Sequence, residues 1–144
     1  MIILVEGINS KDVGERINKF RKELEINFEE IDCSDFKIND YLKLIKKCKH
    51  SDEDYIWYNT FITDQAYKFV LKEEPTLTNN EIISICSMIQ NDAFIAYCVD
   101  DDPEVLYSRS SEFSSKEEFI EYLRAYNITV AASKTLLPVI PYEV

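Results

Sequence analysis

The stretch Ile2-Ile3-Leu4-Val5-Glu6-Gly7 decides the fold of this chain. Four consecutive isoleucine, leucine and valine residues are typical of a central parallel strand, which is covered on both faces and so lacks polar alternation. A helical pattern follows directly, with apolar residues three or four positions apart at Val13, Ile17, Phe20 and Leu24. A buried strand, a glycine and an amphipathic helix in this order predict the first strand-helix unit of an α/β domain.

Strand and helix patterns alternate from this unit to the end of the chain. Strands are expected over 26–31, 55–58, 93–99 and 137–142, and helices are expected to start near Asn39, Phe61, Thr78, Asp102 and Ser115. The alternation predicts a three-layer α/β fold, an open parallel sheet of about five strands with helices on both faces. Because no repeat, low-complexity tract or linker interrupts the pattern, we expect one domain over residues 1–144.

The composition excludes several classes of partner. The net charge is −11, with 27 acidic and 16 basic residues, and such a field repels nucleic acid and anionic membrane surfaces. No apolar run approaches the roughly 20 residues that cross a bilayer, and no secretory signal opens the chain. Four cysteines without a CxxC pair and a single histidine argue against a zinc site and favour reduced, buried thiols. We therefore expect a cytoplasmic protein, in the host cytoplasm if the source is viral, with no membrane or nucleic-acid partner.

The segment after the first strand occupies the place of a phosphate-binding loop. A working loop has the form GxxxxGK[ST], whose glycines expose backbone amides, whose lysine reaches the phosphates and whose hydroxyl binds Mg²⁺. Gly7 fills the first glycine position, but Asp12, Val13 and Gly14 stand at the second glycine, the lysine and the Ser/Thr positions. The aspartate would repel a triphosphate, and the lysine charge and the hydroxyl are both missing.

These residues resemble the thymidylate kinase family of P-loop nucleotide kinases, whose opening strand and loop read I-x-x-E-G. The family signature D-R-x-x-x-S-x-x-x-Y aligns with 58–67, where Thr63 and Tyr67 match the serine and tyrosine. Tyr58 and Asn59 replace the aspartate and arginine that bind the nucleotide and metal in the family.

The resemblance continues along the rest of the chain. The segment from Pro103 to Arg109 looks like the family's P-E-x-x-x-x-R helix with its lid arginine, and 117–126 and 137–140 look like the next helix and the last strand. Family members continue beyond the position of Val144. The resemblance implies the fold of a P-loop nucleoside monophosphate kinase in a degenerate and truncated form.

Two interpretations of the remaining pocket residues stay open: they bind a nucleotide without Mg²⁺ and without turnover, or they only cap and pack helices. Phosphoryl transfer depends on positioning and on neutralising charge, and the groups that neutralise it are missing, so we assign no catalytic residue and no metal ligand. Backbone amides at a helix N-terminus still bind anions without any side chain. The candidate nucleotide- and phosphate-binding residues are Gly7, Asn9, Ser10, Lys11, Thr63, Tyr67 and Arg109.

Alternatives exist for the role of Arg109 and for a nearby acidic run. Arg109 is close in sequence to Glu112 and Glu118 and is expected to pair with one of them instead of a phosphate. The run Asp100–Asp102 offers carboxylates for a metal, but a helix start accounts for the same residues.

Three functions remain open at this point. The leading one is a catalytically inactive kinase-like protein that binds a protein partner, a nucleotide, or both. Its Ile-, Asn- and Lys-rich composition suits a phage protein that targets a host enzyme or defence system. The second is a divergent deoxynucleotide kinase whose rebuilt loop uses Lys11 or Arg16, and the third is an acidic inhibitor that mimics DNA. Family resemblance and apolar residues around Tyr67, such as Phe69 and Ile83, also predict a homodimer.

Overall fold

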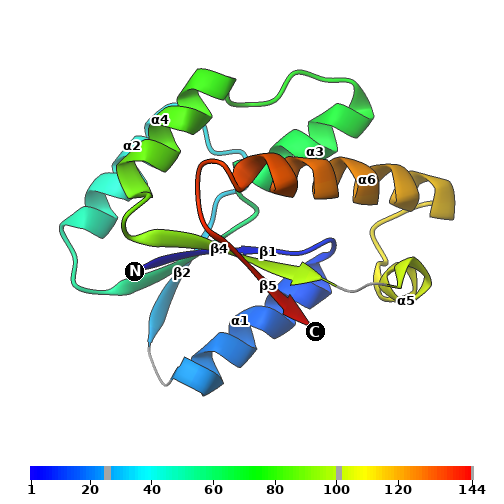
Figure 1. Cartoon of the computed structure of the whole chain (residues 1–144), viewed down its shortest axis with the longest axis horizontal. Coiled ribbons are helices and arrows are strands. Elements are labelled where there is room, and N and C mark those ends of the chain that lie inside the picture. Colours follow the sequence, from blue (N-terminus) through cyan, green and yellow to red (C-terminus); the bar gives the residue numbers. More distant parts are fainter. Residues whose placement is uncertain (25–26, 100–101, 144) are drawn as a thin grey trace.

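A five-stranded parallel sheet forms the centre of the molecule (Figure 1). The computed structural model describes residues 1–24, 27–99 and 102–143. The strands are β1 (Ile2–Glu6), β2 (Phe28–Asp32), β3 (Asp54–Tyr58), β4 (Ala93–Val99) and β5 (Val139–Glu143). They lie in the order β2-β3-β1-β4-β5, and every neighbouring pair is parallel. This is the three-layer α/β fold that the sequence predicts.

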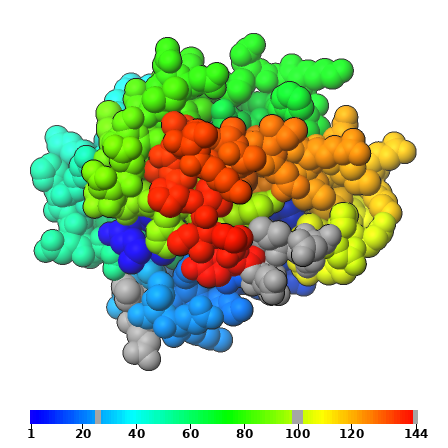
Figure 2. All heavy atoms as spheres, in the orientation of Figure 1, coloured from blue at the N-terminus to red at the C-terminus, as the bar shows by residue number. Residues whose placement is uncertain are grey.

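Helices cover both faces of the sheet, but unequally. They are α1 (Ser10–Leu24), α2 (Ile38–Lys49), α3 (Phe61–Leu71), α4 (Asn79–Ile89), α5 (Pro103–Arg109) and α6 (Lys116–Ser133). Figure 1 shows α1 below the sheet and α2, α3, α4 and α6 above it, with α5 beyond the strand ends. In the space-filling view of Figure 2, α6 and β5 present their side chains at the front of the molecule.

Strand β1 contributes side chains to two hydrophobic clusters, one on each face of the sheet, as its apolar run predicts. Ile2 and Leu4 pack into the larger cluster beneath α2, α3, α4 and α6, whereas Ile3 and Val5 pack against α1. Successive side chains of a strand point to opposite faces, so a strand covered on both sides needs apolar residues at every position. Fully burying each of these side chains contributes about 1.5–3 kcal/mol. β1 is therefore the element that positions everything attached to its carboxyl end.

Local capping signals place most helix starts where the sequence predicts them. Thr78 and Glu81 form a reciprocal capping box at α4, and Ser115 accepts a hydrogen bond from the Glu118 amide at α6. Asp102 likewise caps α5, which has proline at its first position.

Four details differ from the predictions. β2, expected over 26–31, is formed by Phe28–Asp32, and residue 26 lies outside the described residues. Helix α2 begins at Ile38, because the Asp40 carboxylate accepts the Lys37 amide (2.9 Å) from the third helical position and does not itself form the N-cap. Leu24, expected in the core, ends α1 and is 41% exposed. β5 begins at Val139 instead of residue 137, and Leu137 is buried in the preceding turn. Within the described residues, no helix has the length and apolar character needed to span a bilayer.

Candidate functional site

The carboxyl end of β1 carries a buried carboxylate, Glu6. Three hydroxyl groups donate to it: Thr60 Oγ1 at 2.6 Å, Thr63 Oγ1 at 2.8 Å and the Tyr126 hydroxyl at 2.7 Å. Burial raises the pKa of Glu6, and the three hydrogen bonds counteract this only in part. Glu6 thereby joins β1 to α3 and α6 beneath the site.

The phosphate-loop position is occupied by a short turn. Only Gly7, Ile8 and Asn9 separate β1 from α1, and α1 begins at Ser10. Asn9 is the cause, since its Oδ1 accepts the Asp12 backbone N–H at 2.8 Å and so caps the helix. Asp12 and Gly14, which align with a loop glycine and the metal-binding hydroxyl of a working loop, therefore lie within the first turns of α1.

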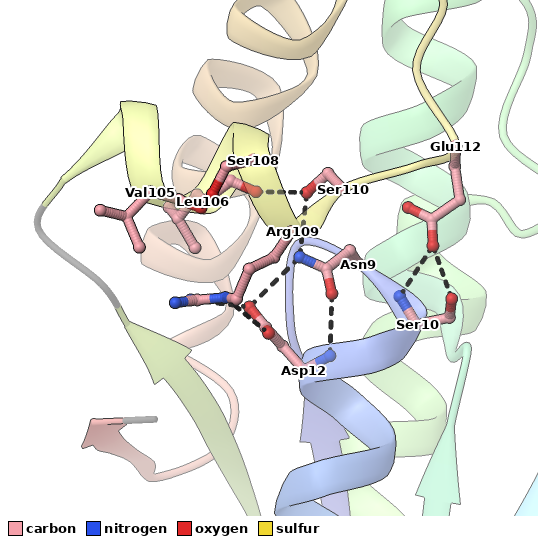
Figure 3. Close-up of polar contacts among 9 residues, drawn as sticks. All are labelled: Asn9, Ser10, Asp12, Val105, Leu106, Ser108, Arg109, Ser110 and Glu112. Atoms are coloured by element: carbon pink, nitrogen blue, oxygen red, sulfur yellow. Dashed lines mark hydrogen bonds and ion pairs between the residues drawn. The ribbon is translucent and has the colours of Figure 1, made fainter.

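Asp12 is paired with Arg109 across the site. The guanidinium Nε and one Nη each donate to a different carboxylate oxygen at 3.1 Å, in a two-point contact. Asp12 is 1% exposed, and Asn9 Nδ2 donates both to it (3.2 Å) and to Ser110 Oγ (2.9 Å). Figure 3 shows Arg109 reaching from the end of α5 to the first turn of α1. The prediction that Arg109 pairs with Glu112 or Glu118 is wrong, because the fold brings α5 against α1.

A carboxylate of the chain itself binds the N-terminus of α1. Glu112 Oε1 accepts the Ser10 backbone N–H at 3.1 Å and the Ser10 hydroxyl at 2.5 Å (Figure 3). Helix N-termini attract anions because of their unpaired N–H groups and the helix dipole. Glu112 thus occupies the place where the sequence predicts a phosphate.

A cavity of about 240 Å³ opens beside this turn, beyond the ends of β1 and β3. Five of the seven predicted binding residues line it: Gly7, Asn9, Ser10, Thr63 and Tyr67. Lys11 is exposed on α1 and Arg109 is turned toward Asp12, so neither cation lines this cavity.

Seven further residues line the cavity, and the four that come from the later part of the chain were not predicted from the sequence: Glu112, Phe113, Glu118 and Tyr122. Tyr122 follows Phe119 by three positions on α6, so helical periodicity assigns it to the apolar face of this helix. This periodicity is the sequence signal by which Tyr122 could have been found. Glu112 and Phe113 lie between α5 and α6, and no local pattern marks them as site residues.

Asn59, which the sequence resemblance aligns with the signature arginine, lines the cavity. Its backbone is left-handed (φ 52°), which asparagine tolerates, and its Nδ2 donates to Asp32 Oδ1 at 3.2 Å. Hydrogen bonds from Ser34 and Asn59 outweigh partial desolvation and lower the pKa of Asp32. The side chain at this position therefore supplies no positive charge to the cavity.

Neither metal ligation nor thiol chemistry has support among the described residues. In those parts of the chain, no group of three or more His, Cys, Asp or Glu side chains is arranged to hold a metal ion. Asp100 and Asp101 of the candidate acidic run lie outside the described residues. Cys33, Cys48 and Cys86 are buried free thiols, and burial raises the pKa of each, to about 12 for Cys86.

Solved structures share this fold at low sequence identity. No protein-family model matches the sequence, and no curated protein matches it significantly. The YorR protein of Bacillus subtilis, solved in complex with phosphorylated GDP, is similar with a TM-score of 0.73 and 18% identity over 99% of this chain and 85% of that chain. Deoxyadenosine kinase from M. mycoides, solved with dCMP and a flexible dCDP, gives 0.59 and 12% over 99% and 90%.

A putative polyphosphate kinase 2 from Pseudomonas aeruginosa gives a TM-score of 0.64 and 12% identity, over 99% of this chain and 34% of that chain. At these identities the likeness shows the fold alone, which is that of the P-loop kinases.

Proposed function

We propose that this chain is a P-loop kinase-fold protein that transfers no phosphate and acts by binding. One observation carries the proposal: the N-terminus of α1, where a kinase of this fold holds phosphate, is engaged by the chain's own Asn9 and Glu112 side chains. A triphosphate entering there would have to displace Glu112 and approach the buried carboxylate of Asp12.

The magnitude of the missing contributions supports the same conclusion. Phosphoryl transfer relies on positioning and electrostatic stabilisation, and a single arginine-finger-type contribution is worth about 10³–10⁵ in rate. Val13 stands at the lysine position, Gly14 at the hydroxyl position and Asn59 at the signature arginine. Arg109, the lid-arginine candidate, has its guanidinium on Asp12. The chain therefore lacks several such contributions at once.

Binding is the role that the remaining geometry supports. The cavity beyond β1 and β3 is open and retains Thr63 and Tyr67. Within the proposal, the chain is a degenerate relative of the thymidylate kinases whose partner is a protein, a nucleotide bound without Mg²⁺, or both. An acidic binding protein of this kind suits a phage that targets a host enzyme or defence system.

A transfer assay tests the proposal. The protein is incubated with radiolabelled ATP or GTP, Mg²⁺ and each deoxynucleoside monophosphate, and we expect no product above the protein-free level. The alternative, a divergent kinase with a rebuilt loop, requires transfer that disappears in Lys11→Ala and persists in the control Lys19→Ala, which changes another exposed lysine of α1. That result would overturn the proposal.

Thermal shift against the same nucleotides, with and without Mg²⁺, separates the two kinds of binding. A ligand at a hundred times its dissociation constant stabilises the native state by about 2.7 kcal/mol. A Mg²⁺-independent shift identifies a nucleotide ligand, whereas no shift directs the search to a protein partner.

We also propose that the chain forms a homodimer through α3 and α6. Phe69 on α3 and Ile128 on α6 are 73% and 67% exposed, and both line an apolar groove of about 280 Å³ between the two helices. Large apolar side chains gathered on one face are typical of protein interfaces.

A further inference from the structure

Tyr122 is a largely buried residue at the cavity wall, and its hydroxyl lacks a protein partner among the described residues. The residue is 5% exposed and lines the cavity beyond β1 and β3, and its ring contacts those of Phe113 (5.3 Å) and Tyr67 (5.9 Å between centroids). Its hydroxyl makes no hydrogen bond to any residue that the structure describes. Tyr126, one turn further along α6, shows the contrast, because its hydroxyl donates to Glu6.

A hydroxyl that faces a cavity and has no protein partner is normally paired with water or with a ligand. Burial, with the nearby charges of Glu6 and Glu112, raises the pKa of Tyr122 and keeps the hydroxyl protonated at neutral pH. A ligand in the cavity therefore meets a neutral phenol, whose O–H donates one hydrogen bond and whose oxygen accepts another.

Three other polar side chains of the lining direct their donors at protein groups. Thr63 donates to Glu6, Ser10 donates to Glu112, and Asn9 donates to Asp12 and Ser110. Acceptors remain, because Glu112 uses only Oε1 and Glu118 accepts only at Oε2, from Ser114. The cavity thus offers acceptors to a ligand that brings N–H donors.

The charge of the lining has one sign. Glu112 and Glu118 line the cavity, and among the residues that the structure describes no lysine or arginine does. Glu118 lies in the first turn of α6, and Glu112 bonds to the N-terminus of α1. A helix N-terminus carries about half a positive charge, so the two helix ends offset about one of the two negative charges and a net charge of about −1 remains. Two nearby cations are engaged elsewhere, Arg109 with Asp12 and Lys116 with Glu104, and Lys11 is exposed on α1 without lining the cavity. This field repels a phosphate and attracts a monovalent cation.

Aromatic rings at the cavity favour a guanidinium over an ammonium group. Tyr67, Phe113 and Tyr122 offer ring surfaces beside the two carboxylates. A guanidinium is planar, is weakly hydrated, stacks on aromatic rings and donates in a fork that matches a carboxylate, whereas an ammonium is compact and strongly hydrated.

We infer that this cavity binds a guanidinium group, carried by an arginine side chain or by a free small molecule. The group donates to Glu112, Glu118 and the Tyr122 oxygen and stacks on the aromatic rings. The inference deepens the proposed function, since it rests on the cavity being a binding site and not a site of phosphate transfer.

Calorimetric titration with four probes tests the inference. N-acetyl-L-argininamide is expected to bind, whereas N-acetyl-L-citrullinamide, which has the same shape without the charge, and dTMP are not. N-acetyl-L-lysinamide is expected to bind at least tenfold more weakly than the arginine probe. Equal binding of the citrulline probe, or binding of dTMP in its place, overturns the inference. Tighter binding of acetyl-Gly-Arg-Gly-amide than of agmatine identifies a protein side chain as the source, and the reverse order identifies a small molecule.

Variants locate the site. Tyr122→Phe keeps the ring packing and removes the hydroxyl, and Glu112→Gln removes one charge; each is expected to weaken the arginine probe roughly five- to tenfold, the equivalent of one hydrogen bond of about 1 kcal/mol or slightly more. The matched controls are Tyr107→Phe on α5 and the exposed Glu121→Gln on α6, which do not line the cavity and leave the affinity unchanged.

Unchanged affinity in Tyr122→Phe overturns the inference, as does the absence of binding by the arginine probe. The transfer assay keeps the two proposals distinguishable. Without arginine binding and without phosphate transfer, only the guanidinium site is wrong, whereas phosphate transfer contradicts the proposed function whatever the arginine probe does.

Discussion

Asp12 and Arg109 lie 97 positions apart in the sequence and form a two-point ion pair beside the cavity of the candidate site. The carboxylate is 1% exposed and the guanidinium side chain 21% exposed, so the pair is largely withdrawn from water. Together with the Asn9–Ser110 hydrogen bond, it fastens the end of α5 to the first turn of α1. Asp12 is thereby an attachment point for the segment that lies over the strand ends.

Removing Arg109 is expected to destabilise the protein strongly. Arg109→Ala leaves Asp12 buried without its cation, and breaking a buried pair in this way costs about 3–5 kcal/mol. The double variant Asp12→Ala/Arg109→Ala is expected to lose less than the sum of the two single variants, because no uncompensated charge remains. Urea unfolding of the four proteins measures the coupling directly.

The exposed pair Lys116–Glu104 is the matched control for this cycle. Both side chains are about half exposed or more, and solvent-exposed ion pairs contribute about 0–1 kcal/mol. A loss in Arg109→Ala no larger than that in Lys116→Ala would contradict the structural role of the buried pair.

The parts of the fold that sequence patterns predict are those whose cause is local. The apolar run Ile2–Val5 identifies a strand buried on both faces, and Thr78 with Glu81 three positions on identifies a capped helix start. The partner of Arg109 could not be predicted in this way, because proximity in sequence favours Glu112 while the three-dimensional fold supplies Asp12.

The candidate site shows the same limit at Tyr122. Helical periodicity places this residue on the apolar face of α6, yet periodicity cannot show that its hydroxyl lies unpaired at a cavity whose walls come from several elements. The early start of α1 is different. Asn9 followed three positions later by Asp12 is a local capping pattern, and it predicts the short turn once the phosphate-loop alignment is set aside.

Gly14 is expected to tolerate, and benefit from, a side chain. It lies within α1 and is exposed, and a Cβ atom built on it meets nothing within 4 Å. Gly14→Ala should therefore raise the free energy of unfolding by about 0.5–1 kcal/mol, since alanine reduces the backbone entropy lost on folding. Chemical denaturation measures the gain, and Glu15→Ala, at the next exposed position, should change stability by less than half as much. A destabilised Gly14→Ala would show that the glycine is needed for a close approach at this turn.

Glu6 is expected to make stability depend on pH. Its pKa is raised above the ordinary value of 4.5 in the folded protein, so in the window above 4.5 the folded state binds more protons than the unfolded state. Stability contributed by the protonated form is then present below 4.5 and is lost as the pH rises through the folded pKa, by up to about 1.4 kcal/mol per pH unit.

Glu6→Gln removes this titration. The free energy of unfolding of the variant minus that of the native protein should therefore increase from pH 5 to pH 7. Urea unfolding at both pH values measures this difference. The glutamine oxygen keeps an acceptor for the hydroxyls of Thr60, Thr63 and Tyr126, which limits the structural change. The same difference between the two proteins at both pH values would contradict a raised pKa.

The α3–α6 face is expected to hold two copies of the chain together. Phe69 is 73% exposed and borders the apolar groove that Ala125, Ile128 and Ala132 of α6 also line. A charge in the middle of an apolar interface is left desolvated and unpaired, so Phe69→Asp should convert a dimer into a monomer without unfolding it. Sedimentation velocity gives the mass of each species. Leu42→Asp on α2 is the control, because it adds the same charge at an exposed apolar position away from the groove and should leave the dimer intact. A native protein that sediments at 16.9 kDa at all concentrations would remove the dimer from the proposal and leave this face for another partner.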